Sequence, residues 1–206
     1  EDEHAASVPE FSDASLYHYA ILSDNVLASS VVVKSAILNS QNPEKHVFHI
    51  ITNKMNMWAM KVWFKMNPPN NVSHIEITSM DDYTFFKSSY MPLLQQLDSD
   101  EQYRNLKYRL MLKHLRFYLP EMFPRLRRML FLDDDVVVQK DLTSLFQINM
   151  EGKVHAAVEI CSASFNRYSH YMNFSHPLIK KKLNPNACAW AYGMNLFDLD
   201  AWRKEK

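Results

Sequence analysis

Three adjacent carboxylates, Asp133, Asp134 and Asp135, are the residues whose types and spacing most directly indicate chemistry in this chain. They lie between two apolar runs, Met129–Leu132 and Val136–Val138. Neighbouring negative charges repel one another and resist burial unless a cation neutralises them. In an extended chain, side chains i and i+2 share a face, so Asp133 and Asp135 can converge on one cation while Asp134 points away. The pattern favours metal or phosphate chemistry.

A simpler interpretation of the same residues is an acidic turn between two strands. Such turns usually carry Gly, Asn or Pro, and none of these lies within the triplet. The choice between a turn and a ligand site therefore depends on the elements predicted around the triplet.

Strand and helix patterns alternate along the first part of the chain. Buried-strand patterns at Leu16–Leu22, His46–Thr52 and Ser73–Thr78 are separated by helical patterns at Val26–Asn39 and Met55–Met66. Alternation of this kind implies parallel strands joined by right-handed crossovers, which is an α/β fold.

The remaining elements are predicted with the same rules. Residues 1–15 are expected to be a disordered lead-in, and Asp81–Glu101 an irregular surface excursion. After these we expect a helix at Tyr103–Leu119 stopped by Pro120, and then a strand at Met129–Leu132. A short helix follows, capped by Asp141 and running through Phe146, and then a strand at Val154–Ile160. The last predicted elements are partly helical structure in Phe165–Lys182 and a strand at Ala189–Leu199, with Asp200 capping a helix after it.

Polar residues gather where three of these strands end. Ser23, Asp24 and Asn25 follow the first strand, the Asp133–Asp135 triplet follows a later one, and Glu159 lies near the end of another. Ligands of open α/β sheets bind beyond the carboxyl ends of the strands. We therefore expect the three clusters to converge on one crevice.

Composition narrows the functional classes. With 206 residues, one domain with a sizeable core is expected, and a net charge of zero gives no sign of a nucleic-acid surface. Only 2 glycines occur, which excludes Gly-rich phosphate loops of the Walker or dinucleotide type. Cys161 and Cys188 are too few for a disulfide framework or a cysteine-only zinc site. They could form one bridge or remain buried thiols, and we favour the thiols.

Five blocks of the sequence, in this order, resemble glycosyltransferase family 8, and in particular the plant α-1,4-galacturonosyltransferases that build pectin. The resemblance runs from about Tyr17 to the last residue. It implies a GT-A, Rossmann-like fold with a mixed central sheet over residues 16–206, without the C-terminal part of that domain. The blocks are YHYAILSDNVLASSVVV (Tyr17–Val33), HVFHIIT (His46–Thr52), HLRFYLPE (His114–Glu121), LFLDDDVVVQKDL (Leu130–Leu142) and NPNACAWAYGMNLFDL (Asn184–Leu199).

The resemblance also implies roles for individual residues. Asp133 and Asp135 look like the D-x-D that holds Mn²⁺, or Mg²⁺, against the two phosphates of a nucleotide sugar; hard carboxylate oxygens suit either ion. A guanidinium at Arg116 could grip phosphate or sugar hydroxyls bidentately. The implied donor-binding residues are Ser23, Asp24, Asn25, Arg116, Asp134, Glu159, Ala191, Tyr192 and Gly193.

Each of these assignments has a structural alternative. Asp24 and Asn25 could be only a helix cap, and Arg116 could pair with Glu121 or another acid on the surface. Glu159 could merely cap a loop. The family's third metal ligand, a His in a C-terminal H-x-x-G-x-x-K-P-W segment, does not occur in this chain, and the resemblance names no catalytic nucleophile.

The function implied by the resemblance is the retaining transfer of galacturonate from UDP-galacturonate to an oligogalacturonide acceptor, which extends homogalacturonan in cell-wall pectin. A uronate donor needs a basic partner, for which Lys113 and Arg167 are candidates. The family also implies a Golgi membrane protein with a lumenal catalytic domain and membrane-anchored partner galacturonosyltransferases. Sequons at Asn71 and Asn173 are compatible with a lumenal chain.

Two other functions fit parts of the sequence. Asp133-x-Asp135-x-Val137 also satisfies the D-x-D-x-[TV] pattern of haloacid-dehalogenase-type phosphatases, in which the first Asp is a nucleophile. That motif normally closes the first strand of its domain, whereas several predicted strands precede it here. A non-catalytic Golgi scaffold or anchor would keep the fold with little activity.

Overall fold

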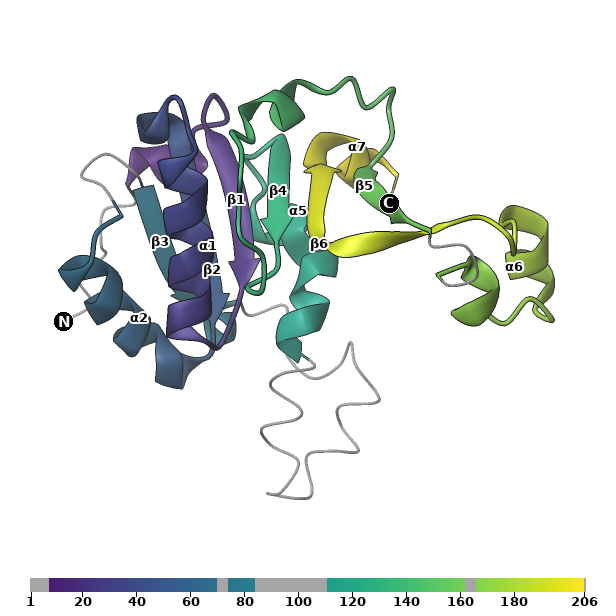
Figure 1. The fold of residues 1–206 in the computed structure, drawn as a ribbon, viewed down its shortest axis with the longest axis horizontal. Coiled ribbons are helices and arrows are strands. Elements are labelled where there is room, and N and C mark those ends of the chain that lie inside the picture. The colour runs from purple at the N-terminus through teal and green to yellow at the C-terminus, as the bar shows by residue number, and fades with distance from the viewer. Residues whose placement is uncertain (1–7, 70–73, 84–110, 162–165, 206) are drawn as a thin grey trace, which may run out of the picture.

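Six strands form one mixed sheet at the centre of the molecule (Figure 1). The computed structural model describes residues 8–69, 74–83, 111–161 and 166–205. The strands lie in the order β3-β2-β1-β4-β6-β5. Their bounds are Tyr17–Leu22 (β1), His46–Thr52 (β2), His74–Ser79 (β3), Arg128–Leu132 (β4), His155–Ile160 (β5) and Ala189–Asp198 (β6).

The directions of the strands agree with the predicted α/β fold. β1, β2, β3 and β4 are parallel to one another, whereas β6 runs antiparallel to both β4 and β5. The carboxyl ends of β1, β4 and β5 therefore point toward the same edge of the sheet. A mixed sheet with the candidate residues along this edge is the predicted architecture.

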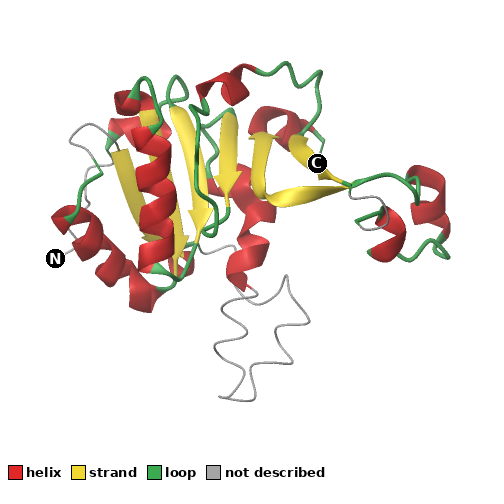
Figure 2. Cartoon of the chain, viewed as in Figure 1, coloured by secondary structure: helices red, strands yellow, loops and turns green. Residues whose placement is uncertain are grey.

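Helices cover both faces of the sheet (Figure 2). α1 (Val26–Leu38) and α2 (Lys54–Met66) pack on one face, where Tyr19 and Ile21 of β1 point. Ala20 and Leu22 point to the other face, which is covered by a 3-10 helix at Leu115–Tyr118, α5 (Leu119–Met122) and α7 (Leu199–Lys204). This alternation follows from the two-residue repeat of a strand. Each large side chain buried in this way contributes about 1.5–3 kcal/mol.

The short elements differ most from their predictions. Pro120 does not stop a helix but lies in the first turn of α5, where its missing N–H is not needed. Asp198, not Asp200, caps α7, since its carboxylate accepts the N–H of Ala201; Asp200 instead pairs with Arg203. Further 3-10 helices span Pro9–Ser12, Pro43–Lys45, Met80–Asp82, Thr143–Gln147 and Tyr168–His170.

Other predictions are met in part. The expected disordered lead-in contains the 3-10 helix at Pro9–Ser12, and Phe11 there contacts the ring of His49. Asp141 accepts the N–H of Thr143 at the start of the short helix predicted after it. The excursion at Asp81–Glu101 and the helix from Tyr103 lie largely outside the described residues, and only residues 111–119 of that helix can be compared.

The two cysteines form a disulfide, which corrects the expectation of buried thiols. Cys161 follows β5 and Cys188 precedes β6, and their Cα atoms are 5.3 Å apart. Because β5 and β6 pair antiparallel, these two positions lie side by side at the end of the hairpin. The segment beyond them, which includes α6 (Pro177–Lys182), extends away from the sheet at the right of Figure 1.

Candidate functional site

The ends of β1 and β4 are joined directly by a hydrogen bond between two candidate residues. The buried hydroxyl of Ser23 donates to Asp134 Oδ2 at 2.5 Å and accepts the N–H of Asn25 at 2.9 Å. Asn25 caps α1, because its side chain accepts the N–H groups of Leu27 and Ala28. Asp134 therefore points back toward the end of β1.

The Asp134–Asp135 segment forms a turn, and Val136–Val138 continues in an irregular extended conformation instead of a second strand. The N–H of Val138 donates to Ser35 Oγ, and its carbonyl accepts from Asn39 Nδ2, both on α1 or at its end. Hydrogen bonds to α1 thus replace the ladder of a sheet and hold the segment after the triplet in place.

Arg116 pairs with the first aspartate of the triplet. Its Nη2 lies 3.3 Å from Asp133 Oδ1, and its guanidinium stacks 4.4 Å from the ring centre of Phe131. Burial raises the pKa of Asp133, Arg116 opposes that shift, and the charges of Asp135 and Asp134 add to it. The acid with which Arg116 pairs is therefore a member of the triplet.

β6 approaches the triplet through its backbone. The N–H of Asp133 donates to the carbonyl of Gly193 at 2.9 Å. A Cβ atom at position 193 would lie 3.2 Å from Val136 Cγ1, so glycine permits this close contact. Gly193 thus lies directly against the triplet, whereas the neighbouring Tyr192 is 58% exposed.

A bulge in β6 presents Ala191, Tyr192 and Gly193. Ala157 pairs with Asn195 and Glu159 pairs with Trp190, so one residue of β5 faces four residues of β6. The buried side chain of Asn195 donates to the carbonyls of Ala191 and Tyr192 and contacts His155 Nε2 at 2.5 Å. Sequence reasoning missed Asn195 and His155, since an Asn inside an apolar strand carries no signal beyond its burial.

Glu159 and Asp24 take more peripheral places. Both are exposed. Glu159 pairs with Trp190 of β6, next to Ala191. Burial, Tyr192 and Glu159 together raise the pKa of the Tyr168 phenol. Asp24 lies beside Ser23, and its backbone carbonyl accepts from Asn56. The three strand-end clusters thus share one edge of the sheet, but only two of them touch directly.

The two basic candidates for a uronate carboxylate are placed differently. The positive charge of Lys113 acts on Asp133, and its side chain is exposed. Arg167 lies before the start of β6, where it bridges Cys188 and its Nη1 donates to the carbonyl of Asn186 at 2.7 Å. Lys113 therefore lies at the triplet, and Arg167 supports the loop at the disulfide.

Asp133 and Asp135 provide a donor set that suits a hard divalent cation. No cluster of three or more His, Cys, Asp or Glu side chains able to hold a metal occurs among the residues that the structure describes. Mg²⁺-type sites often use only one or two carboxylates and complete their coordination with substrate phosphates and water. Burial is the main cause of the raised pKa of Asp133, and the charges of Asp135 and Asp134 add to it; a bound cation would offset both effects.

A hollow also lies among Tyr17, Arg128, Phe146 and Asp198. Tyr17 and Arg128 begin β1 and β4, so this hollow is at the edge opposite the triplet. Arg128 is engaged there by the carbonyls of Phe146 and Ile148. The candidate residues named above lie at the carboxyl edge, which is therefore the candidate site.

Comparison with known proteins agrees with this geometry. A family model described as glycosyl transferase family 8 matches residues 16–206. "Probable galacturonosyltransferase 9" of Arabidopsis thaliana is 56% identical over 96% of this chain, which spans 39% of that relative. The bifunctional glycosyltransferase WbbM superposes with a TM-score of 0.62 at 15% identity, covering 94% of this chain and 33% of WbbM.

A second solved structure supports the same fold. The galactosyltransferase LgtC, in complex with donor and acceptor sugar analogues, superposes with a TM-score of 0.53 at 14% identity, covering 92% of this chain and 60% of LgtC. The mixed sheet with helices on both faces is therefore the predicted GT-A fold. None of the described helices is long and apolar enough to cross a membrane.

Proposed function

The chain belongs to glycosyl transferase family 8, and from this premise we propose that it forms the donor-binding part of a galacturonosyltransferase. The protein would transfer galacturonate from UDP-galacturonate to an oligogalacturonide and so extend homogalacturonan. The name of the Arabidopsis relative supports the sugar. The single observation that carries the proposal is the joining of Ser23 to Asp134 and of Arg116 to Asp133 at one edge of a GT-A sheet.

Donor binding follows from the chemistry at this edge. The Ser23–Asp134 bond fixes the turn that follows β4, so Asp133 and Asp135 have defined positions before a ligand arrives. Arg116 lies half-buried between Phe131 and Tyr192, where a guanidinium can reach a phosphate oxygen as well as Asp133. The close approach of Gly193 leaves backbone, not a side chain, next to the triplet.

We infer that Asp133 and Asp135 hold Mn²⁺ or Mg²⁺. Such an ion, when bound, neutralises the charge that develops on a departing diphosphate. The bond between the anomeric carbon and the diphosphate oxygen breaks, the acceptor hydroxyl forms the new bond, and its proton passes to the departing diphosphate. Arg116 stabilises that leaving group, and the other residues of the edge orient the donor. Retention of the anomeric configuration is part of the proposal.

Lys113 is the basic residue that we assign to the uronate carboxylate. Its charge already acts on Asp133, whereas Arg167 is held by the carbonyl of Asn186. We further propose a Golgi membrane protein with a lumenal catalytic domain and membrane-anchored partner galacturonosyltransferases; the disulfide between Cys161 and Cys188 is compatible with such an oxidising compartment.

A competition assay tests the proposed sugar. The full-length protein is incubated with Mn²⁺, an oligogalacturonide and equal amounts of UDP-galacturonate and UDP-galactose, and the products are identified by mass spectrometry. We expect galacturonate to be incorporated at least roughly tenfold in preference, because a site with a charged partner rejects a donor that lacks the matching group. The new linkage should be α by NMR, and Asp133→Asn should abolish transfer of both sugars.

Three other results are distinguishable. Equal use of both donors would overturn the galacturonate assignment and leave the fold unaffected. No transfer by a protein that still binds UDP would favour the non-catalytic scaffold. Phosphatase activity lost in Asp133→Asn would favour the haloacid-dehalogenase alternative, although Asp133 follows β4, and β1, β2 and β3 precede it among the described residues.

A further inference from the structure

The segment between Cys161 and Cys188 concentrates positive charge in a chain whose net charge is zero. It holds Arg167, Lys180, Lys181 and Lys182 and no Asp or Glu. The three lysines are exposed in the last turn of α6. We call residues 166–187 the basic lobe; they extend away from the main body of the sheet (Figure 1).

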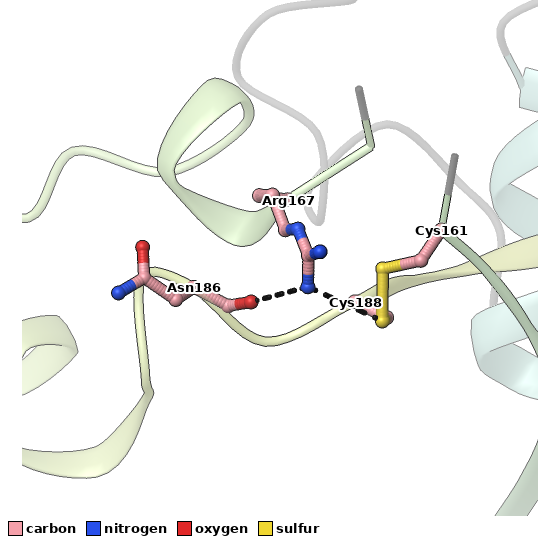
Figure 3. Close-up of a disulfide and its surroundings, with 4 residues drawn as sticks. All are labelled: Cys161, Arg167, Asn186 and Cys188. Carbon is pink, nitrogen blue, oxygen red and sulfur yellow. Dashed lines mark hydrogen bonds between the residues drawn. A yellow bond between two sulfur atoms is a disulfide. The ribbon is translucent and has the colours of Figure 1, made fainter. Parts of the chain in front are cut away.

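The base of the basic lobe is fixed to the β5–β6 hairpin (Figure 3). The disulfide closes the hairpin, and Arg167 forms an isolated bridge with Cys188. The side chain of Arg167 donates to the carbonyl of Asn186, and the N–H of Ala189 donates to the carbonyl of Asn166 at 2.7 Å. The lobe is therefore held in a defined place relative to β6.

A row of aromatic rings leads from the basic lobe to the candidate donor site. The rings of Tyr168 and Trp190 are 5.6 Å apart, and those of Trp190 and Tyr192 are 6.1 Å apart. The guanidinium of Arg116 lies 5.6 Å from the ring of Tyr192 and pairs with Asp133. Three rings thus lead from Tyr168, in the basic lobe, to Arg116 and the aspartate triplet.

We propose that the basic lobe and the row Tyr168–Trp190–Tyr192 bind an extended anionic sugar chain, whose reactive end reaches the donor site. Sugar faces pack on aromatic rings, and carboxylates pair with exposed lysines. The inference deepens the proposed function, on which it rests, by naming the acceptor's binding surface. Glu159 is exposed and pairs with Trp190 across β5 and β6, so its carboxylate can accept hydroxyls of a sugar bound along the row.

Two simpler roles for the lysines explain fewer of these observations. Lysines in the last turn of a helix interact favourably with its dipole, but that role does not account for the absence of acids throughout the segment. A basic patch can also bind an anionic membrane surface. A row of rings that ends at the aspartate triplet matches a linear sugar chain better than a flat surface.

Two triple variants of the full-length protein test the inference. Lys180→Gln/Lys181→Gln/Lys182→Gln removes the lysines of the lobe. Lys34→Gln/Lys45→Gln/Lys65→Gln removes three exposed lysines from elsewhere and is the matched control. Binding of an oligogalacturonide is measured without donor at several salt concentrations, alongside binding of UDP with Mn²⁺.

We expect the lobe variant to bind the oligogalacturonide roughly tenfold more weakly and with a smaller salt dependence, since three charge pairs are lost. The control variant and the affinity for UDP should be unchanged. A fully methyl-esterified oligogalacturonide should bind weakly to the wild type and to both triple variants. Trp190→Leu should also weaken binding, and Trp190→Tyr should restore most of it.

Equal oligogalacturonide affinities of the two triple variants would overturn the inference. It would also be overturned if only binding to phosphatidylserine vesicles fell in the lobe variant, a result that would assign the lobe to a membrane surface. The donor competition assay fails or succeeds independently of these titrations. Lobe-dependent binding of the anionic chain by a protein that does not transfer galacturonate would support the inference and contradict the proposed function.

Discussion

At the scale of single residues, the close contact of Gly193 with Asp133 and Val136 constrains the candidate site. The carbonyl of Gly193 accepts the N–H of Asp133, and its Cα faces the methyl group of Val136. A side chain at position 193 would displace one of the two segments that define where Asp133 lies.

We predict that Gly193→Ala raises the dissociation constant of UDP with Mn²⁺ by roughly three- to tenfold, because overpacking of this kind costs about 1 kcal/mol or more. The double variant Gly193→Ala/Val136→Ala should restore the affinity, since the Cγ1 atom that lies 3.2 Å from the new Cβ is removed. Calorimetric titration of the three proteins, with Val136→Ala alone as control, measures both effects. Unchanged affinity in Gly193→Ala, or no recovery in the double variant, would contradict this account.

The residue types of the sequence predict the triplet better than they predict the residues around it. The triplet stands out by its residue types, whereas the bond of Asp134 to Ser23 depends on a turn after β4 where the residue pattern predicts an extended chain. The role of Asn195 depends on a bulge that appears only when β5 and β6 are paired. The disulfide is not predictable from the sequence for the same reason, because Cys161 and Cys188 become neighbours through that pairing.

At the scale of elements, a chain of hydrogen bonds crosses three strands of the sheet. Neutral His18 donates from Nε2 to the carbonyl of Asp13, so its Nδ1 accepts from His49 Nε2 at 2.9 Å. The Nδ1 of His49 and Glu76 Oε2 are hydrogen-bonded at 2.6 Å. The chain links β1, β2 and β3 to the segment that follows the helix at Pro9–Ser12.

The titration of His18 should make stability depend on pH. Burial lowers the pKa of His18 from 6.5 to about 4, so the unfolded chain takes up a proton between these values and the folded protein does not. Stability therefore falls as the pH decreases from 6.5 to 4, by about 2 kcal/mol at pH 5 from this residue. The lowered pKa of His18 already includes the effects of Asp13, His49 and Glu76, which face it.

Urea unfolding at pH 7 and pH 5 measures this effect. His18→Gln can donate to Asp13 and accept from His49 without titrating, so its loss of stability between the two pH values should be smaller than that of the wild type by the same amount. Burial also lowers the pKa of His46, and that contribution remains in both proteins. Identical pH dependence of the two proteins would contradict the role assigned to His18.

The long elements are predictable from the sequence and the short ones are not. Periodic apolar patterns in β2 and α2 define their bounds within a residue, because burial on a sheet requires that pattern. The turn at Pro120 and the cap at Asp198 depend on which N–H groups the fold leaves unpaired. The composition of Val136–Val138 is typical of a strand, yet its partner is α1.

At the scale of the whole molecule, the arrangement of strands gathers the polar residues. Parallel β1 and β4 bring Ser23 and the triplet to one edge, and antiparallel β6 brings Gly193 back to the same edge. The hairpin of β5 and β6 then carries the basic lobe outward from that edge. One sheet thus holds a candidate donor site and, by our inference, the surface for the acceptor.

The central claim is that Asp133 and Asp135 bind a nucleotide diphosphate through a divalent cation. Calorimetric titration of the full-length protein with UDP, with Mn²⁺ and then with EDTA, tests it most directly, with Asp135→Asn as the variant because Asp135 is exposed. We predict that UDP binds at least roughly tenfold more tightly with Mn²⁺ and that Asp135→Asn loses this difference. Equal UDP affinity with and without Mn²⁺, or an unchanged difference in Asp135→Asn, would contradict the account.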